Sequence, residues 1–365
     1  MNLIKGFTPN WFTVGMGTGI LALDAYTLPG GPSWLKTVAI GIALFNVLIV
    51  TGLVVLGILK GIYDRPGVRE VLDHPIQSMF FGAIPMALTT VVNAVFDMGS
   101  RYGAVTAYHV GAILWMINVV LAVVSGFGIP FWMFTRHDHD LSRMTAVWLM
   151  PIVPAEVVAA SGAILLPHVA VLAFRQDLLI GIMVLWAFSV PMAFLMLGIL
   201  FIRLTLHKLP PEDLAISTWI TLGTLGTGVM GLAGIAHDVR FAFPLFNTGI
   251  QGAALLGAVV LWGLGLWWMG QSVFITLYYL RTRRLRFNLG WWGLTFPLGV
   301  FAGGTDLLYR ALGTGILGWA AWIFFIMLAI FWVMVTGFTV GHLRRLSRHA
   351  AGGVERTTDP MKRVS

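Results

Sequence analysis

Glu156 has the clearest capacity for chemistry in this sequence, because its carboxyl group falls inside an apolar stretch long enough to cross a membrane. An ionisable side chain at such a depth is costly and is a functional candidate by default. It could exchange a proton. It could equally be a hydrogen-bonded packing residue on the helix face opposite Pro154. The residue type alone leaves both interpretations open.

A second polar group is the run His137-Asp138-His139-Asp140, whose imidazole and carboxylate groups could bind a metal ion. Alternating histidine and aspartate just before a helix is more typical of a solvated segment that caps the helix. The sequence contains no cysteine and no His-Glu-x-x-His motif. We therefore expect no metal site, no cofactor, no catalytic residues and no enzymatic activity.

Other polar residues accompany apolar segments. We expect His109 and Asn118 to make contacts between helices or subunits rather than to bind a ligand. His237, Asp238 and Arg240 follow an apolar segment at its end. Arg240 could attract anions there, or it could simply pair with Asp238.

The run Trp291–Gly299 places Phe296 directly before Pro297, near the middle of an apolar segment. A proline inside a helix removes one backbone hydrogen bond and displaces the carbonyl group four residues earlier. A soluble core helix has little use for this arrangement. In a helix that lines a pathway, the break would open the backbone and the phenylalanine ring could fill the space.

The composition indicates what kind of elements must position these residues. A soluble domain carries about 25% charged residues, whereas this chain is 58% hydrophobic and 10% charged, with a mean hydropathy of +0.86. The sequence therefore predicts an all-α, polytopic membrane protein without a sizeable soluble domain. An apolar span begins close to the N-terminus, so we expect no cleavable signal.

A membrane span needs roughly 20 apolar residues, and the sequence contains ten such stretches. We predict one transmembrane domain over residues 1–343 and a basic, disordered cytoplasmic tail over 344–365. The expected spans are 9–29, 36–60, 78–98, 105–134, 144–167, 176–205, 214–236, 246–281, 287–310 and 315–343.

The lysines and arginines predict the orientation of these spans. With ten spans, 18 of the 23 lysines and arginines fall on the side that holds both termini. The positive-inside rule then places both termini in the cytoplasm. We expect the membrane to be the inner, or plasma, membrane of the cell. This asymmetry accounts for most of the net charge of +8, so the charge is not evidence for nucleic acid binding.

The odd-numbered spans share a feature at one depth. Each carries a proline or a glycine cluster eight to ten residues from its cytoplasmic start, which is about 12–15 Å into a core of about 30 Å. Unpaired backbone is tolerated there only where protein buries it or water reaches it. We predict that these residues line a central pathway, although packing kinks are the alternative. They are Gly17, Thr18 and Gly19; Pro85, Thr89 and Asn93; Pro151 and Pro154; Gly223, Thr224 and Thr227; and Phe296 and Pro297.

Several stretches resemble one known family, the tellurite-resistance/dicarboxylate transporters. That family includes the plant guard-cell slow anion channel, fungal sulphite efflux pumps and the yeast-type malic acid transporter. The similar stretches are His74–Met86, Trp148–Pro154 with Ala159-Ala160, His207–Pro211 and Trp291–Pro297. They extend from the second predicted loop to the ninth predicted span, so the resemblance covers nearly the whole chain.

The resemblance implies a fold of ten helices arranged as five hairpins, with five inner odd-numbered helices around a pore, usually in a homotrimer. It implies that Phe296 is a gate and that the substrate is a small anion, such as malate, sulphite or tellurite. The seventh span departs from the sulphite and malate branch. It reads Leu222-Gly-Thr224-Leu-Gly-Thr227-Gly, without the proline and glutamine expected there.

Two alternatives to a channel remain at this stage. A proton-coupled anion carrier would use Glu156, although an ionised glutamate in an anion pathway would repel the substrate. A membrane-embedded enzyme would need histidines and carboxylates gathered at one depth, which the spacing does not predict.

Overall fold

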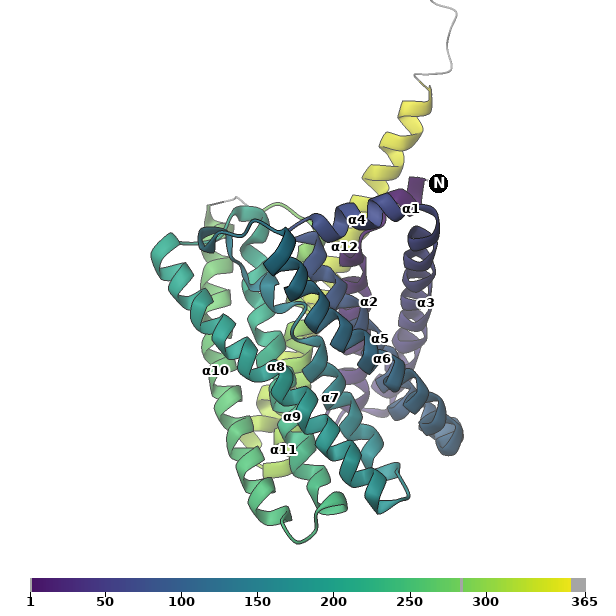
Figure 1. The fold of residues 1–365 in the computed structure, drawn as a ribbon, viewed down its shortest axis with the longest axis vertical. Coiled ribbons are helices and arrows are strands. Elements are labelled where there is room, and N and C mark those ends of the chain that lie inside the picture. The colour runs from purple at the N-terminus through teal and green to yellow at the C-terminus, as the bar shows by residue number, and fades with distance from the viewer. Residues whose placement is uncertain (1, 283–284, 356–365) are drawn as a thin grey trace, which may run out of the picture.

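The computed structural model describes residues 2–282 and 285–355. The described residues form helices joined by turns and loops, and no strand occurs among them. Figure 1 shows long helices running along the length of one bundle, with the short helix α4 lying across one end. The α-helices are α1 (Asn2–Gly6), α2 (Phe12–Thr27), α3 (Ser33–Tyr63), α4 (Arg65–Asp73), α5 (Ala83–Ala94), α6 (Ser100–Arg136), α7 (Pro154–Leu165), α8 (Leu172–His207), α9 (Thr221–Ala242), α10 (Asn247–Arg281), α11 (Phe296–Leu312) and α12 (Gly315–Glu355).

The helices fall into a buried set and an exposed set. Helices α2, α5, α7, α9 and α11 are buried over most of their length. Helices α3, α6, α8, α10 and α12 expose large apolar side chains along one face, such as Leu48 on α3 and Trp319 on α12. An exposed apolar face of this length is what a lipid environment accommodates. The chain is therefore a multi-pass membrane protein with a buried inner set of helices.

The inner helices close into a ring. Helix α2 packs against α5, α5 against α7, α7 against α9, α9 against α11, and α11 against α2. Each inner helix also packs against the exposed helix that follows it in the chain, which pairs α2 with α3, α5 with α6, α7 with α8, α9 with α10, and α11 with α12. Each inner helix therefore has neighbours on both sides and a cover on its outer face.

Each inner α-helix is preceded by a tighter helical segment. The 3₁₀ segments Pro9–Trp11, Gln77–Gly82, Ala146–Leu149, Glu212–Ile220 and Leu289–Leu294 lead into α2, α5, α7, α9 and α11. Pro154 and Pro297 stand in the first turn of their α-helices, and Pro85 is the third residue of α5. Proline suits the first turn because its missing N–H would have no helical partner there. The predicted proline breaks therefore lie where 3₁₀ geometry gives way to α.

The glycine clusters behave differently from the expected breaks. Gly17 and Gly19 lie inside an uninterrupted α2, and Gly223 lies inside an uninterrupted α9. Glycine keeps its backbone N–H, so it does not force a break as proline does. The change of helix type in these two spans comes earlier, before Phe12 and before Thr221.

Six helical stretches of the described chain are long and apolar enough to cross a membrane: Ser33–Tyr63, Gln77–Arg136, Leu172–His207, Glu212–Ala242, Asn247–Arg281 and Gly315–Arg345. Gln77–Arg136 covers two of the expected spans, 78–98 and 105–134. The expected spans 9–29, 144–167 and 287–310 are not among these stretches. Their α-helices α2, α7 and α11 have 16, 12 and 17 residues.

Hydrogen bonds from exposed helices hold the ring. Asn118 of α6 donates to the Pro85 carbonyl oxygen at 2.9 Å, and Trp186 of α8 donates to the Gly228 carbonyl oxygen at 3.1 Å. Trp332 of α12 donates to the Thr18 hydroxyl at 3.1 Å. Such bonds satisfy polar groups that would otherwise be buried without a partner.

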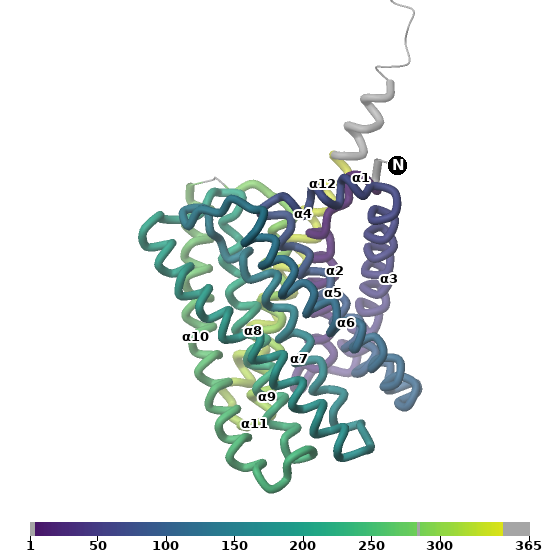
Figure 2. Tube along the Cα trace, viewed as in Figure 1, coloured from purple at the N-terminus to yellow at the C-terminus, as the bar shows by residue number. Residues whose placement is uncertain are grey.

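Helix α1 and the distal part of α12 lie at the same end of the bundle in Figure 1. Figure 2 shows α1 and α4 together at that end. The tail expected from Arg344 begins as a continuation of α12, which extends to Glu355. The remainder of that predicted tail, residues 356–365, lies outside the described residues.

Candidate functional site

A small cavity lies at the centre of the ring, with a volume of about 20 Å³. All five inner helices contribute to its wall. Its lining residues are Ile20 and Leu23 of α2, Thr89, Thr90 and Asn93 of α5, Val157 and Ala160 of α7, Thr227 and Met230 of α9, and Phe296 and Val300 of α11. Phe296 and the polar residues Thr89, Asn93 and Thr227 thus lie around one cavity. The sequence analysis assigned these residues to one depth.

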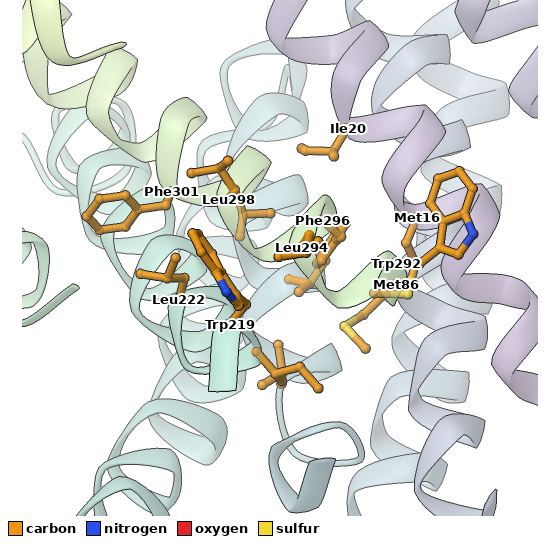
Figure 3. Close-up of a cluster of buried hydrophobic side chains, with 14 of the residues drawn as sticks. Met16, Ile20, Met86, Trp219, Leu222, Trp292, Leu294, Phe296, Leu298 and Phe301 are labelled. Carbon is orange, nitrogen blue, oxygen red and sulfur yellow. The ribbon is translucent and has the colours of Figure 1, made fainter. Parts of the chain in front are cut away.

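Phe296 is the first residue of α11 and forms part of this wall. Its side chain is only 3% exposed. Figure 3 shows Phe296 between Met16, Ile20 and Met86 on one side and Leu222 on the other. Its position is set by the change from the 3₁₀ segment to α11, at which the Gly299 N–H donates to the Thr295 carbonyl oxygen at 2.9 Å.

The cavity is closed to anything much larger than water. A water molecule needs roughly 10–15 Å³ of such space, so about 20 Å³ holds one. A polyatomic anion does not fit. The Phe296 ring is the bulkiest of the lining side chains, so its displacement would enlarge the space more than that of any other.

The lining is electrically neutral, and its polar side chains are already bonded. The Thr89 hydroxyl donates to the Pro85 carbonyl oxygen at 2.9 Å, and the Thr227 hydroxyl donates to the Gly223 carbonyl oxygen at 2.7 Å. Ser161 of α7 donates to the Asn93 side-chain oxygen at 2.5 Å. A wall of this kind can offer weak contacts to a passing ion without a fixed charge that would trap it.

The remaining residues of the predicted set are buried but do not line the cavity. Thr18 accepts the bond from Trp332 of α12 and so faces away from the ring. Gly17 allows α2 to approach Trp292 and Thr295, and Gly19 allows it to approach Thr90. The others are buried and are not lining residues: Pro85, Pro151, Pro154, Gly223, Thr224 and Pro297.

Glu156 lies in the seam between α7 and α9 rather than in the cavity wall. Its side chain is fully buried, and its Oε2 atom lies near Gly228 of α9. The Thr224 and Thr227 hydroxyls lie beside the carboxyl group. Within the described residues neither carboxyl oxygen completes a hydrogen bond of good geometry. The carboxyl group therefore lies outside the cavity wall, and both interpretations of Glu156 stay open.

The histidine-rich loop is a capped, partly packed segment. The Asp140 carboxylate accepts a bond from the Ser142 N–H at 2.7 Å and caps the following 3₁₀ turn. This contact with Ser142 lowers the pKa of Asp140. His137 bonds to the Leu72 carbonyl oxygen at 2.8 Å, and His139 packs against Trp148. The described residues contain no cluster of three or more metal-binding side chains.

The other polar candidates make local contacts. His109 is exposed and bonds to the carbonyl oxygen of Val105 in its own helix. His237 stands between Asp238 and Arg240, at 2.8 Å from each. Arg240 is therefore linked to Asp238 through the histidine, whereas a direct Asp238–Arg240 pair was one of the two alternatives from the sequence.

Sequence reasoning missed two kinds of residue. Apolar lining residues such as Met230 and Val300 carry no signal that separates them from ordinary core residues. Asp24 and Asp306 do carry one, since each is an acidic residue inside an expected span, 9–29 or 287–310. An acidic residue inside a membrane span is a functional candidate, as Glu156 is.

The family model for SLAC1, described as voltage-dependent anion channel, matches residues 6–340. The chain belongs to this family. The resemblance to the tellurite-resistance/dicarboxylate transporters is thereby confirmed over nearly the whole chain. The family is one of anion channels and transporters, which is consistent with the expectation of no enzymatic activity.

Individual relatives match over almost their full length. The sulfite efflux pump SSU1 of Arthroderma otae is 33% identical over 349 residues, which cover 92% of this chain and 91% of the relative. The transporter MJ0576 of Methanocaldococcus jannaschii is 26% identical, with 92% of both chains covered. The sulfite efflux pump SSU1 of Saccharomyces cerevisiae is 23% identical, with 84% of this chain and 80% of the relative covered.

Proposed function

We propose that this protein moves small anions across a membrane through the centre of the ring, and that Phe296 is the gate. The observation that carries the proposal is the central cavity, which all five inner helices line and whose wall includes Phe296. The apolar phenyl ring of Phe296 in a narrow, neutral cavity fits an anion path that opens when this side chain moves. Membership of an anion-channel family supports the same conclusion.

The proposed architecture has ten membrane spans in five hairpins. The three expected spans that are too short as single helices would cross the membrane as a 3₁₀ or turn segment followed by an α-helix. Irregular backbone at that depth is tolerated because other helices bury it. Both termini would face the cytoplasm, in agreement with the positive charge at the loops of their end. We further propose a homotrimer in the inner, or plasma, membrane.

The proposed substrate is a small oxyanion, with sulphite first. Two of the relatives just described are sulfite efflux pumps. A C4-dicarboxylate such as malate and the oxyanion tellurite are the other members of the proposed class. The polar part of the wall consists of threonine and asparagine side chains rather than a cation, so binding should be weak and the passage fast.

The gate is tested with purified protein in liposomes. Phe296→Ala removes the ring from the cavity wall, so anion flux should rise by about tenfold or more, since an apolar constriction then gives way to a water-filled passage. Flux is followed for chloride, nitrate, sulphite and malate, which also orders the substrates. Unchanged flux of every anion in Phe296→Ala would remove the gate assignment.

A matched control comes from the same helix. Phe301 is also fully buried in α11. Its phenyl ring, however, packs against Trp262 of α10 and Phe324 of α12, on the outer side of the ring of helices. Phe301→Ala should therefore lower stability without opening the passage. Equal increases in flux for both variants would indicate a general loosening of the ring rather than a gate.

A further inference from the structure

Asp24 and Asp306 meet at the far end of the ring, where the inner helices finish. Both side chains line a second cavity of about 10 Å³, between α2, α11 and α12. Asp24 is 6% exposed and Asp306 is 5% exposed. The two carboxyl groups are close enough to repel each other. Two buried carboxyl groups from different helices thus share one small space.

Each carboxyl group has an oxygen that lacks a partner. The Asp306 Oδ2 atom accepts bonds from Arg310 at 2.9 Å, and Arg310 also donates to the Thr27 carbonyl oxygen. By contrast, Asp24 Oδ2 and Asp306 Oδ1 are buried without a hydrogen-bond partner within the described part of the chain. A buried, unpaired carboxylate oxygen is costly. The two free acceptor oxygens could be satisfied by a proton held on one of the carboxyl groups.

The charges around the pair leave an excess of negative charge. Arg310 is the cation that contacts Asp306, and Asp97, which follows α5, also interacts with Arg310. Lys36 of α3 lies over the ring of Tyr26, 5.9 Å from its centre. Helix α12 carries no charged residue from Gly315 to Gly341. With Asp24 and Asp306 both ionised, one arginine cannot neutralise the site.

The size of the site indicates which cation would bind. The rest of the lining is mainly apolar, with Leu28, Ala302 and Phe325 among its members. A space of about 10 Å³ accommodates at most one water molecule. A metal cation such as calcium takes six to eight oxygen ligands, which this lining does not supply. A proton needs only the two free carboxylate oxygens.

The pair is also connected to the gate. Met230 of α9 lines the central cavity beside Phe296, and its side chain lies with the Asp24 carboxyl group against Gly303 of α11. Asp24 follows the lining residue Leu23 directly. Met230 therefore lies close to both the Asp24 carboxyl group and the central cavity.

We infer that Asp24 and Asp306 form a proton-binding site that controls the charge at the outer mouth of the anion passage. This inference rests on the proposed function. With the proton absent, the pair repels anions approaching the ring; with it bound, the repulsion falls. Low pH on that side should then favour anion passage. The proton site is separate from Glu156, which lies in the seam between α7 and α9.

The test compares the wild type with Asp24→Asn in liposomes at about pH 5 and about pH 8. Nitrate and chloride are used because neither titrates in this range. Wild-type flux should be about tenfold higher at the lower pH, the size expected from removing one charge several ångströms from the path. Asp24→Asn should be pH-independent and should match the wild type at the lower pH. Asp24→Glu keeps the carboxyl group and should restore the pH dependence.

Two controls separate the possible failures. Asp177→Asn removes an exposed carboxyl group near the start of α8 and should keep the wild-type pH profile. Infrared difference spectra between the two pH values should show a protonated carboxyl band that Asp24→Asn loses and Asp177→Asn retains. A band unchanged in Asp24→Asn, or a pH profile that survives this substitution, would overturn the proton site. A wild type that passes no anion but shows the Asp24 band would refute the proposed function and leave the proton site standing.

Discussion

At the scale of single residues, the ring separates polar groups by what they contact. The threonine hydroxyls at the central cavity donate to carbonyl oxygens of their own helices, so they present neutral, partly occupied acceptors to the space. The carboxyl groups are kept out of that wall: Glu156 is in a helix seam, and Asp24 and Asp306 are at the mouth. An anion path gains from this separation because a fixed negative charge beside it would repel the substrate.

Glu156→Gln tests this separation. Glutamine keeps the shape of the side chain and can bond to the Thr224 and Thr227 hydroxyls beside it. We expect anion flux within about twofold of the wild type and an unchanged pH profile, because the substitution lies outside the cavity wall. Liposome flux at the same two pH values measures both.

The control for this prediction is Glu156→Ala. Alanine leaves a gap in the fully buried seam, so it should lower the free energy of unfolding by about 1–3 kcal/mol. A pH profile abolished by Glu156→Gln and retained in Asp24→Asn would instead assign proton exchange to Glu156.

At the scale of elements, close backbone approach holds the inner helices together. A Cβ atom added at Gly226 of α9 would come within 2.5 Å of the Phe301 backbone nitrogen in α11. The same addition at Gly223, about one turn earlier, would meet Pro297 only at 3.7 Å, an ordinary contact. The close approach of α9 and α11 therefore requires glycine at position 226 but not at position 223. Small residues at helix contacts serve this purpose in membranes.

Gly226→Ala should force α9 and α11 apart and lower stability by about 1–3 kcal/mol, the usual cost of overpacking. Thermal unfolding in mild detergent should show a lower Tm for Gly226→Ala than for Gly223→Ala, which should stay near the wild type. Equal Tm values for the two variants would contradict the close approach at Gly226.

Proline and glycine differ in how well they predict the backbone of these helices from the sequence. Proline has an obligatory effect on the backbone, and the breaks predicted within spans at Pro154 and Pro297 fall instead in the first turn of an α-helix. Glycine permits several conformations, and the clusters at Gly17 and Gly223 lie in continuous helices. The direction in which Thr18 points depends on Trp332, a residue 314 positions away. Contacts of that kind are set by packing and leave no mark in local spacing.

At the scale of the whole molecule, the central cavity belongs to one chain. Its wall is completed by α2, α5, α7, α9 and α11 of a single copy. The exposed helices carry apolar faces on all sides of this ring, with side chains such as Leu48 and Phe134 largely exposed. Such faces can contact lipid or another copy without altering the ring. Assembly should therefore add copies of a complete passage rather than build a new one.

The last prediction follows from this independence. Native mass spectrometry in mild detergent should give three times the chain mass of 39.9 kDa for the proposed homotrimer, and a purely monomeric mass would refute the assembly. In mixed assemblies of wild type and Phe296→Ala, anion flux should rise linearly with the fraction of variant chains, because each ring opens by itself. Wild-type chains with a neutral tag serve as the control for mixing. A strongly curved dependence would mean that the gates act together, which a cavity lined by one chain does not predict.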